Sequence, residues 1–197
     1  RNHPLTIAHR GERHLVEAKL GYEDMPYQLY PNQRMDLLEN TQERANLRFV
    51  GSFGWGTLEA RAYHERVEHF MDFGADKRYW YGAATGGASA ENGAECAPVG
   101  SPCAAGMPMH TESRTTGFSA RAAVPLGEGG VVRAGGEYQG YRLDDWWPPS
   151  GGGMWPDTFW NVRDGNRDRK ALFAEWEGRA GERWMALAGI RYERVET

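Results

Sequence analysis

The sequence has no excess of basic residues and no long hydrophobic run. It contains 23 lysines and arginines against 27 aspartates and glutamates, for a formal net charge of -4, which argues against a nucleic-acid partner. No stretch approaches the roughly 18 to 20 consecutive apolar residues that a membrane-spanning helix needs. Spanning helices are therefore excluded. Spanning strands are not, because each needs only about ten residues with one apolar face.

The motifs of common enzymes are also missing. The sequence contains neither a Walker loop nor a dinucleotide-binding fingerprint, and the stretch around Ser52 lacks the leading glycine of a nucleophile elbow. His64 and His69 superficially resemble the pair in a zinc-protease helix, but they are five residues apart, so they share no face of a helix or a strand. We therefore expect no enzymatic activity and no catalytic residues.

Cysteine is scarce. Cys96 and Cys103 lie in a segment rich in glycine, alanine and proline, where either a small disulfide loop or a thiolate metal ligand is possible. The chain starts at Arg1 without an initiator methionine and stops at Thr197 inside a predicted strand. We expect it to be a piece of a longer protein.

Glycines and aromatic residues are abundant, with 26 Gly, 8 Trp, 9 Tyr and 7 Phe, a composition that favours strands and tight turns. Apolar and polar residues alternate with a period of two, as in Val16, Ala18 and Leu20 against Glu17 and Lys19. The alternation predicts seven strands, within residues 14–24, 41–53, 58–63, 118–124, 132–139, 172–176 and 186–193.

Short and long connections alternate between these strands. The short ones carry glycine, at residues 54–57, 127–130 and 178–183, and the long ones cover residues 25–40, 72–114 and 144–167. An outer-membrane barrel has this pattern, with tight periplasmic turns at one end and long extracellular loops at the other, and a soluble sandwich has no reason for it. Aromatic pairs lie near the predicted lipid surface: Phe70 and Phe73, Tyr138 and Tyr141, Trp146 and Trp147, Phe159 and Trp160. Each residue alone suits either an interfacial girdle or loop contacts, but together they favour the girdle.

One connecting segment concentrates soft metal donors. Cys103, Met107, Met109 and His110 bring a thiol, two thioethers and an imidazole into eight residues, a donor set that suits Cu(I). If the segment is extended, Met107 and Met109 lie on one side. Methionines also fill irregular loops, and a disulfide to Cys96 would remove the thiol, so both alternatives stay open.

A second connecting segment is rich in tryptophan. Trp146, Trp147, Met154 and Trp155 could form a ligand-contacting loop, with Met154 as a further soft donor, or the loop could simply fold over a barrel mouth. Residues 161–169 read as a turn that enters a strand, which is a structural role.

Several segments together resemble the copper-associated branch of the TonB-dependent outer-membrane receptors. They are spread over nearly the whole chain and are specific only as a group: residues 24–28, 31–36, 58–63, 107–109, 142–149 and 163–169. The resemblance implies an all-β fold, an antiparallel transmembrane β-barrel of 22 strands with an N-terminal plug. Residues 1–197 would be a partial barrel domain without the plug and the remaining strands.

The resemblance also implies a function, a location and partners. The family places copper donors as a Cys and a Met in the plug and a His and a Met in a barrel loop. Cys103 with Met107 imitates the first pair, and Met109 with Met107 or His110 the second, although here the histidine follows the methionine. The protein would lie in the outer membrane of a Gram-negative bacterium. It would contact lipid, copper or a copper-bearing ligand, and TonB through the plug.

Two other functions remain open. A receptor of the same architecture could take an organic ligand such as a siderophore, with the tryptophan-rich loop stacking on it. Alternatively, the chain could be a soluble β-sandwich carbohydrate-binding module whose aromatic residues hold sugars.

Overall fold

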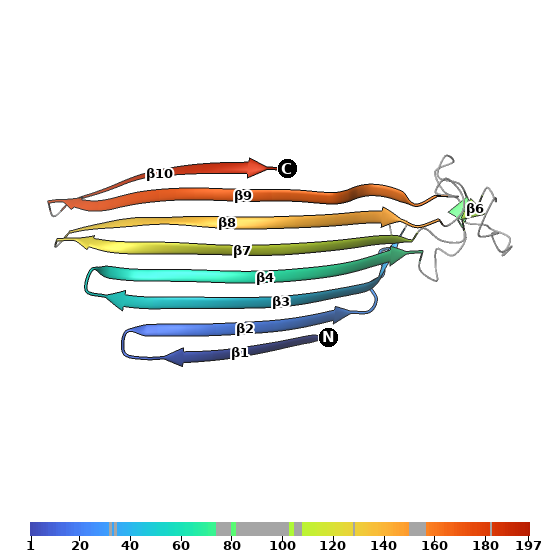
Figure 1. The fold of residues 1–197 in the computed structure, drawn as a ribbon, viewed down its shortest axis with the longest axis horizontal. Coiled ribbons are helices and arrows are strands. Elements are labelled where there is room, and N and C mark those ends of the chain that lie inside the picture. The colour runs from blue at the N-terminus through green and yellow to red at the C-terminus, as the bar shows by residue number, and fades with distance from the viewer. Residues whose placement is uncertain are drawn as a thin grey trace.

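The chain folds into one large antiparallel sheet (Figure 1). The computed structural model describes residues 1–31, 33, 35–73, 80–81, 103–104, 108–127, 129–149, 157–181 and 183–197. Eight strands pair in the order β1-β2-β3-β4-β7-β8-β9-β10, so each strand of the sheet lies beside the next one along the chain. Their bounds are β1 Asn2–Arg10, β2 His14–Met25, β3 Asp36–Phe53, β4 Gly56–Asp72, β7 Met109–Leu126, β8 Gly130–Trp147, β9 Phe159–Ala180 and β10 Trp184–Glu196.

Two short strands form a separate pair: β5 (Trp80–Tyr81) and β6 (Cys103–Ala104). The described residues include no helix long and apolar enough to cross a membrane.

The expectation of an all-β antiparallel fold is confirmed, but the large sheet has eight strands where seven were predicted. The alternation did not reveal β1, because its apolar Leu5 and Ile7 make only a short run before His9 and Arg10. β1 is recognised through its pairing, because Leu5 lies opposite Leu20 and Ile7 opposite Ala18.

Short and long connections alternate as expected. The short ones are residues 11–13, 54–55, 127–129 and 181–183, at one end of the sheet, and the long ones are 26–35, 73–108 and 148–158, at the other (Figure 1). Gly127 and Gly181 have φ of 62° and 72°, the left-handed conformation that glycine adopts without strain. The long connections are shorter than predicted because β3, β7, β8 and β9 continue past the apolar alternation.

The stretch 161–169, expected to be a turn, lies inside β9. Its irregularity is a break in register between β8 and β9, where Asp164 takes a φ of 53° and its backbone N–H donates to Asp144 Oδ1 at 2.8 Å. A bulge of this kind inserts extra residues without ending the strand. The turn-like composition therefore marks a bulge.

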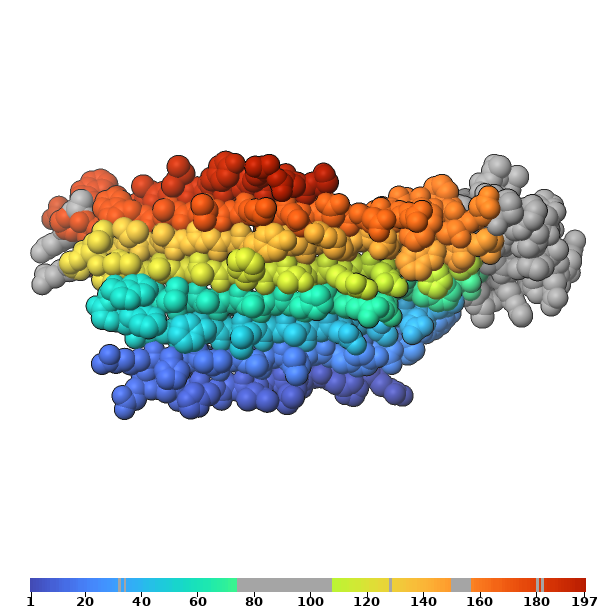
Figure 2. Space-filling view, in the orientation of Figure 1, coloured from blue at the N-terminus to red at the C-terminus, as the bar shows by residue number. Residues whose placement is uncertain are grey.

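The sheet is a single layer with almost no interior of its own, and Figure 2 shows one of its two faces. Leu37 and Ala171 are the only buried hydrophobic residues in the described part of the chain. Leu20, Phe118 and Ile190 are 55%, 57% and 75% exposed. A sandwich would cover these side chains with a second sheet. Apolar surface of this extent is instead typical of a membrane or partner contact.

The two faces of the sheet differ in chemistry. Residues opposite one another in register share a face, and one face carries a continuous apolar band across all eight strands. We call it the outward face, and the opposite, charged one the inner face. Examples from the band are Leu5, Leu20, Leu47, Ala62, Phe118, Val132, Leu172 and Ile190.

The edge of the apolar band crosses the strands obliquely. Tyr22, the last band residue of β2, lies at the level of Arg142 on β8, whereas Leu172, the last band residue of β9, lies opposite Gly136. The edge thus moves by six residues, roughly 20 Å, over five strand spacings of about 4.8 Å. The corresponding strand tilt is about 40°, within the range of about 35–45° found in membrane barrels.

Candidate functional site

The inner face is held together by ion pairs between neighbouring strands. Arg133 Nη1 lies 2.7 Å from Glu175 Oε1 and 2.8 Å from Glu177 Oε2. Glu137 is shared by Arg191 at 2.6 Å and Arg169 at 3.2 Å. Ion pairs therefore link β8, β9 and β10, as expected of a surface that faces water.

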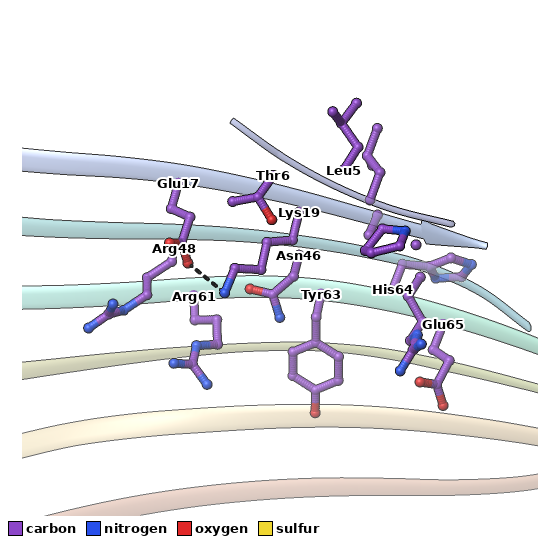
Figure 3. A pocket seen from close by; sticks show the side chains of 15 residues that line it. Leu5, Thr6, Glu17, Lys19, Asn46, Arg48, Arg61, Tyr63, His64 and Glu65 are labelled. Carbon is purple, nitrogen blue, oxygen red and sulfur yellow. Dashed lines mark ion pairs between the residues drawn. The ribbon is translucent and has the colours of Figure 1, made fainter. Parts of the chain in front are cut away.

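A hollow of about 440 Å³ lies in the inner face where β1 to β4 meet (Figure 3). Lys19 Nζ lies 3.2 Å from Glu17 Oε1 within it, and Arg48 and Arg61 project from the next strands. Tyr63 reaches sideways from the hollow, and its hydroxyl accepts a hydrogen bond from Gln139 Nε2 at 3.1 Å.

Gly117 makes the position of Tyr63 possible. A Cβ at Gly117 would come within 2.4 Å of the Tyr63 ring, so a glycine is required where the ring crosses β7. The ring therefore covers the gap in the inner face and links β4 to β8.

The soft-donor residues do not all come together. Met109 and His110 are the first residues of β7, so their side chains lie on opposite faces. Met109 is on the inner face and pairs with Met71 of β4, whereas His110 is on the outward face and pairs with Phe70. Cys103 lies in β6, but its side chain is not among those described, and Met107 and Cys96 lie outside the described residues.

His110 belongs to a row of aromatic rings in contact, stacked on Phe70 and Trp146, with Trp160 tilted against Trp146. Its ring centroid is 4.5 Å from that of Phe70 and 5.2 Å from that of Trp146, and Trp146 is 5.5 Å from Trp160. Arg163 adds a cation above Trp160 at 5.2 Å. The row joins four strands at the base of the long connections. Pairs of this geometry contribute about 0.5–1.5 kcal/mol each.

Trp146 and Trp147 lie in β8, and not in a loop as predicted. Trp147 is on the face opposite Trp146 and pairs with Phe159. Its Nε1 is buried without a hydrogen-bond partner among the described residues. Met154 and Trp155 lie outside the described residues.

The aromatic row also differs from the expected girdle. Phe70 lies eight residues beyond Ala62, the last apolar residue of the band on β4, which is roughly 26 Å along the strand. Of the predicted girdle residues, Tyr138 does stand at the edge of the band, opposite Phe118. Tyr141 lies on the inner face.

Sequence reasoning missed two residues at the inner-face rim. His69-Phe70-Met71 has the His-x-Met order, and both side chains face inward beside Met109. His69 Nδ1 lies 3.1 Å from Asn40 Oδ1. The His-x-Met order can be read from the sequence, but the partner of Met71 cannot. Met71 and Met109 lie on strands that the connection 73–108 separates in the sequence. Their pairing is therefore visible only in the register of the folded sheet.

His69 stands beyond the apolar band and outside the part of β4 that would cross lipid. Burial lowers its pKa, and the charge of Asp145 acts in the opposite direction. His64 faces outward, as the five-residue spacing required, with its Nδ1 2.7 Å from Thr116 Oγ1. Among the described residues, no three His, Cys, Asp or Glu side chains are placed to hold a metal ion, a criterion that does not consider methionine.

Comparison with known proteins agrees with this architecture. Residues 8–197 match the family model "TonB dependent receptor-like, beta-barrel". Solved structures of similar fold include one named "Copper transporter OprC", with a TM-score of 0.72 and 17% sequence identity. The alignment covers 98% of this chain and 28% of that one, so this chain spans about a quarter of its length. No curated protein sequence gives a match. The family match includes seven strands of the sheet in full and the end of β1, and the chain belongs to the TonB-dependent receptor-like β-barrel family.

Proposed function

We propose that this chain is part of an outer-membrane receptor that binds copper at its extracellular rim and admits it through the barrel. The observation that carries the proposal is the pair Met71 and Met109, directly opposite each other on the inner face, with His69 two residues from Met71. Two thioethers and an imidazole are the soft donors that favour Cu(I) over harder ions.

The geometry of a cross-strand pair suits shared coordination. Side chains directly opposite each other in an antiparallel pair have Cβ atoms about 4.5–5.5 Å apart, within reach of two thioethers around one ion. His69 is the diagonal neighbour of Met109 on the same face. The proposal therefore assigns the imidazole to His69. His110 cannot join Met109 at one ion while both remain in β7.

The surroundings of this rim are polar and partly unsatisfied. Thr111 Oγ1 donates to Asp145 Oδ2 at 2.9 Å, while Asp145 Oδ1 and Trp147 Nε1 are buried without partners among the described residues. Met107 and Cys103 precede Met109 closely in the sequence and are candidates for further donors. Of the two predicted ligand-contacting tryptophans that the structure describes, Trp147 is the one on this inner side.

The transport step belongs to the complete receptor. The part outside this chain would supply the plug through which TonB transmits energy, together with the strands that close the barrel. Copper is the cargo, so no covalent bond is made or broken, and selectivity rests on the softness of the donors. The resemblance to a structure named as a copper transporter supports this cargo over an organic chelate.

Cu(I) affinity tests the proposal. The complete receptor is titrated in detergent against a chromophoric Cu(I) chelator under reducing conditions. Met71→Leu with Met109→Leu should weaken binding at least tenfold, as should His69→Ala. Met185→Leu is the control, because Met185 is 69% exposed in β10 near the short turns. Unchanged affinity in the double variant contradicts the proposal. Binding of a ferric chelate without any response to copper supports a siderophore receptor.

A further inference from the structure

Charged residues on the outward face follow one order on five neighbouring strands. Counting away from the short connections, a basic residue comes first and an acidic residue stands two positions farther on the same face. The pairs are Arg66 and Glu68 on β4, Arg114 and Glu112 on β7, Arg142 and Asp144 on β8, Lys170 and Asp168 on β9, and Arg194 and Glu196 on β10. We call the five basic residues the basic belt.

Residues of the basic belt stand beside one another. Arg114 lies directly opposite both Arg66 and Arg142, and Lys170 lies directly opposite Arg194. Like charges placed opposite one another destabilise a sheet unless an anion compensates them. The belt therefore requires compensating negative charge along its whole length.

The acidic residues compensate the belt only in part. Arg114 is 3.9 Å from Glu112, and Lys170 is 3.8 Å from Glu196, which are loose contacts on side chains 56% and 60% exposed. Arg142 Nη1 pairs with Asp168 Oδ1 at 2.7 Å, and Arg66 and Arg194 contact Glu68 and Glu196. A guanidinium has five N–H donors, and the side chains of Arg142 and Arg194 are 52% and 64% exposed, so donors of the belt remain available to an external anion.

The height of the belt matches that of lipid phosphates. Arg66 stands four residues beyond Ala62 at the edge of the apolar band, and Lys170 two residues beyond Leu172. These separations correspond to roughly 7–13 Å along the strands. Because the strands are tilted, the height above the acyl region is smaller. The acidic residues lie another 7 Å or so farther along the strands, above the phosphate layer.

An apolar groove extends from the apolar band to the basic belt. It has a volume of about 570 Å³ on the outward face, and small residues such as Gly136 leave room between the larger Phe118, Leu172 and Tyr192. Lys170 and Arg194 line the same groove. A groove lined by apolar side chains, with two cations among its lining residues, is complementary to a lipid whose acyl chain carries a phosphorylated headgroup.

We propose that the basic belt binds the phosphates of a phosphorylated glycolipid of the outer leaflet, with one acyl chain in the groove. Arginine recognises phosphate with paired, charge-assisted hydrogen bonds, and the belt offers three arginines in one row and two further cations. The inference rests on the outer-membrane location in the proposed function, and it is independent of copper.

The test uses the complete receptor and purified lipopolysaccharide as the probe. Arg114→Gln with Lys170→Gln is compared with Arg61→Gln and Arg121→Gln on the inner face, whose pairs with Glu59 are similarly loose at 3.7 and 3.6 Å. Binding is measured by titration in detergent, and folding by heat-dependent gel mobility. The belt variant should bind about thirtyfold more weakly, since each cation near an anionic surface contributes about 1 kcal/mol. The inner-face variant should bind as the unmodified receptor does.

Three results would overturn the proposal. The first is equal binding in the belt and inner-face variants. The second is undiminished binding of enzymatically dephosphorylated lipopolysaccharide. The third is displacement of the lipid by millimolar inorganic phosphate, which would identify a free-anion site. Cu(I) affinity is measured on the same variants to distinguish this proposal from the copper proposal. The belt variant should lose lipopolysaccharide binding and retain its Cu(I) affinity.

Discussion

An arginine introduced on the outward face should lower the unfolding free energy far more than an arginine at the neighbouring position on the inner face. Ala120 lies inside the apolar band of β7, opposite Ala60 and Gly136, and Ser119 precedes it on the inner face, between Arg61 and Glu137. Ala120→Arg places a charge in lipid, which costs about 2–4 kcal/mol near the midplane of a barrel. Ser119→Arg places the same side chain in water beside a carboxylate, where an exposed pair is worth about 0–1 kcal/mol.

Equilibrium unfolding in guanidinium of the complete receptor, folded into phospholipid vesicles, measures both variants by tryptophan fluorescence. We expect Ala120→Arg to lose about 2–4 kcal/mol of unfolding free energy. Ser119→Arg should stay within about 1 kcal/mol of the unmodified receptor. A loss at residue 119 that equals or exceeds the loss at residue 120 would refute the assignment of the two faces.

Three further changes test separate parts of the structure by the same unfolding measurement. Gly127→Ala should cost about 1 kcal/mol because its φ is 62°, whereas Gly54→Ala, with open space around it, should cost little; equal costs contradict the turn geometry. Trp146→Ala removes two ring contacts and should lower the unfolding free energy by about 1–3 kcal/mol. Hydrogen exchange at residues 109–112 should become faster. Trp184→Ala, at a position that is 75% exposed, is the control. Arg133→Gln breaks ion pairs of 2.7 and 2.8 Å and should lower the unfolding free energy slightly at low salt and not measurably in about 1 M salt; a salt-independent loss would mean that the side chain matters through packing.

The architecture was largely readable from the sequence because it depends on local patterns. Alternation such as Val16, Ala18 and Leu20 records which face meets lipid, and glycine-bearing turns record where the chain reverses. The ends of the strands were not readable in this way. Above the apolar band both faces of β7 and β9 are polar, so the period-two signal disappears while the backbone pairing continues.

The candidate site was less readable because it depends on register. Met109 and His110 are neighbours in sequence and look like one donor group, but adjacent residues of a strand face opposite ways. Met71 and Met109 are far apart in sequence, and only the pairing of β4 with β7 brings them together. The basic belt is hidden for the same reason, since each strand contributes one cation to it.

Spin-label accessibility along β7 tests the central claim most directly. Single cysteines at residues 118–123 of the complete receptor, each carrying a nitroxide, are measured in vesicles with oxygen, which concentrates in lipid, and with a water-soluble nickel complex. We predict that residues 118, 120 and 122 favour oxygen and that residues 119, 121 and 123 favour the nickel complex. Equal accessibility to both reagents at all six positions, or the opposite alternation, would contradict the account.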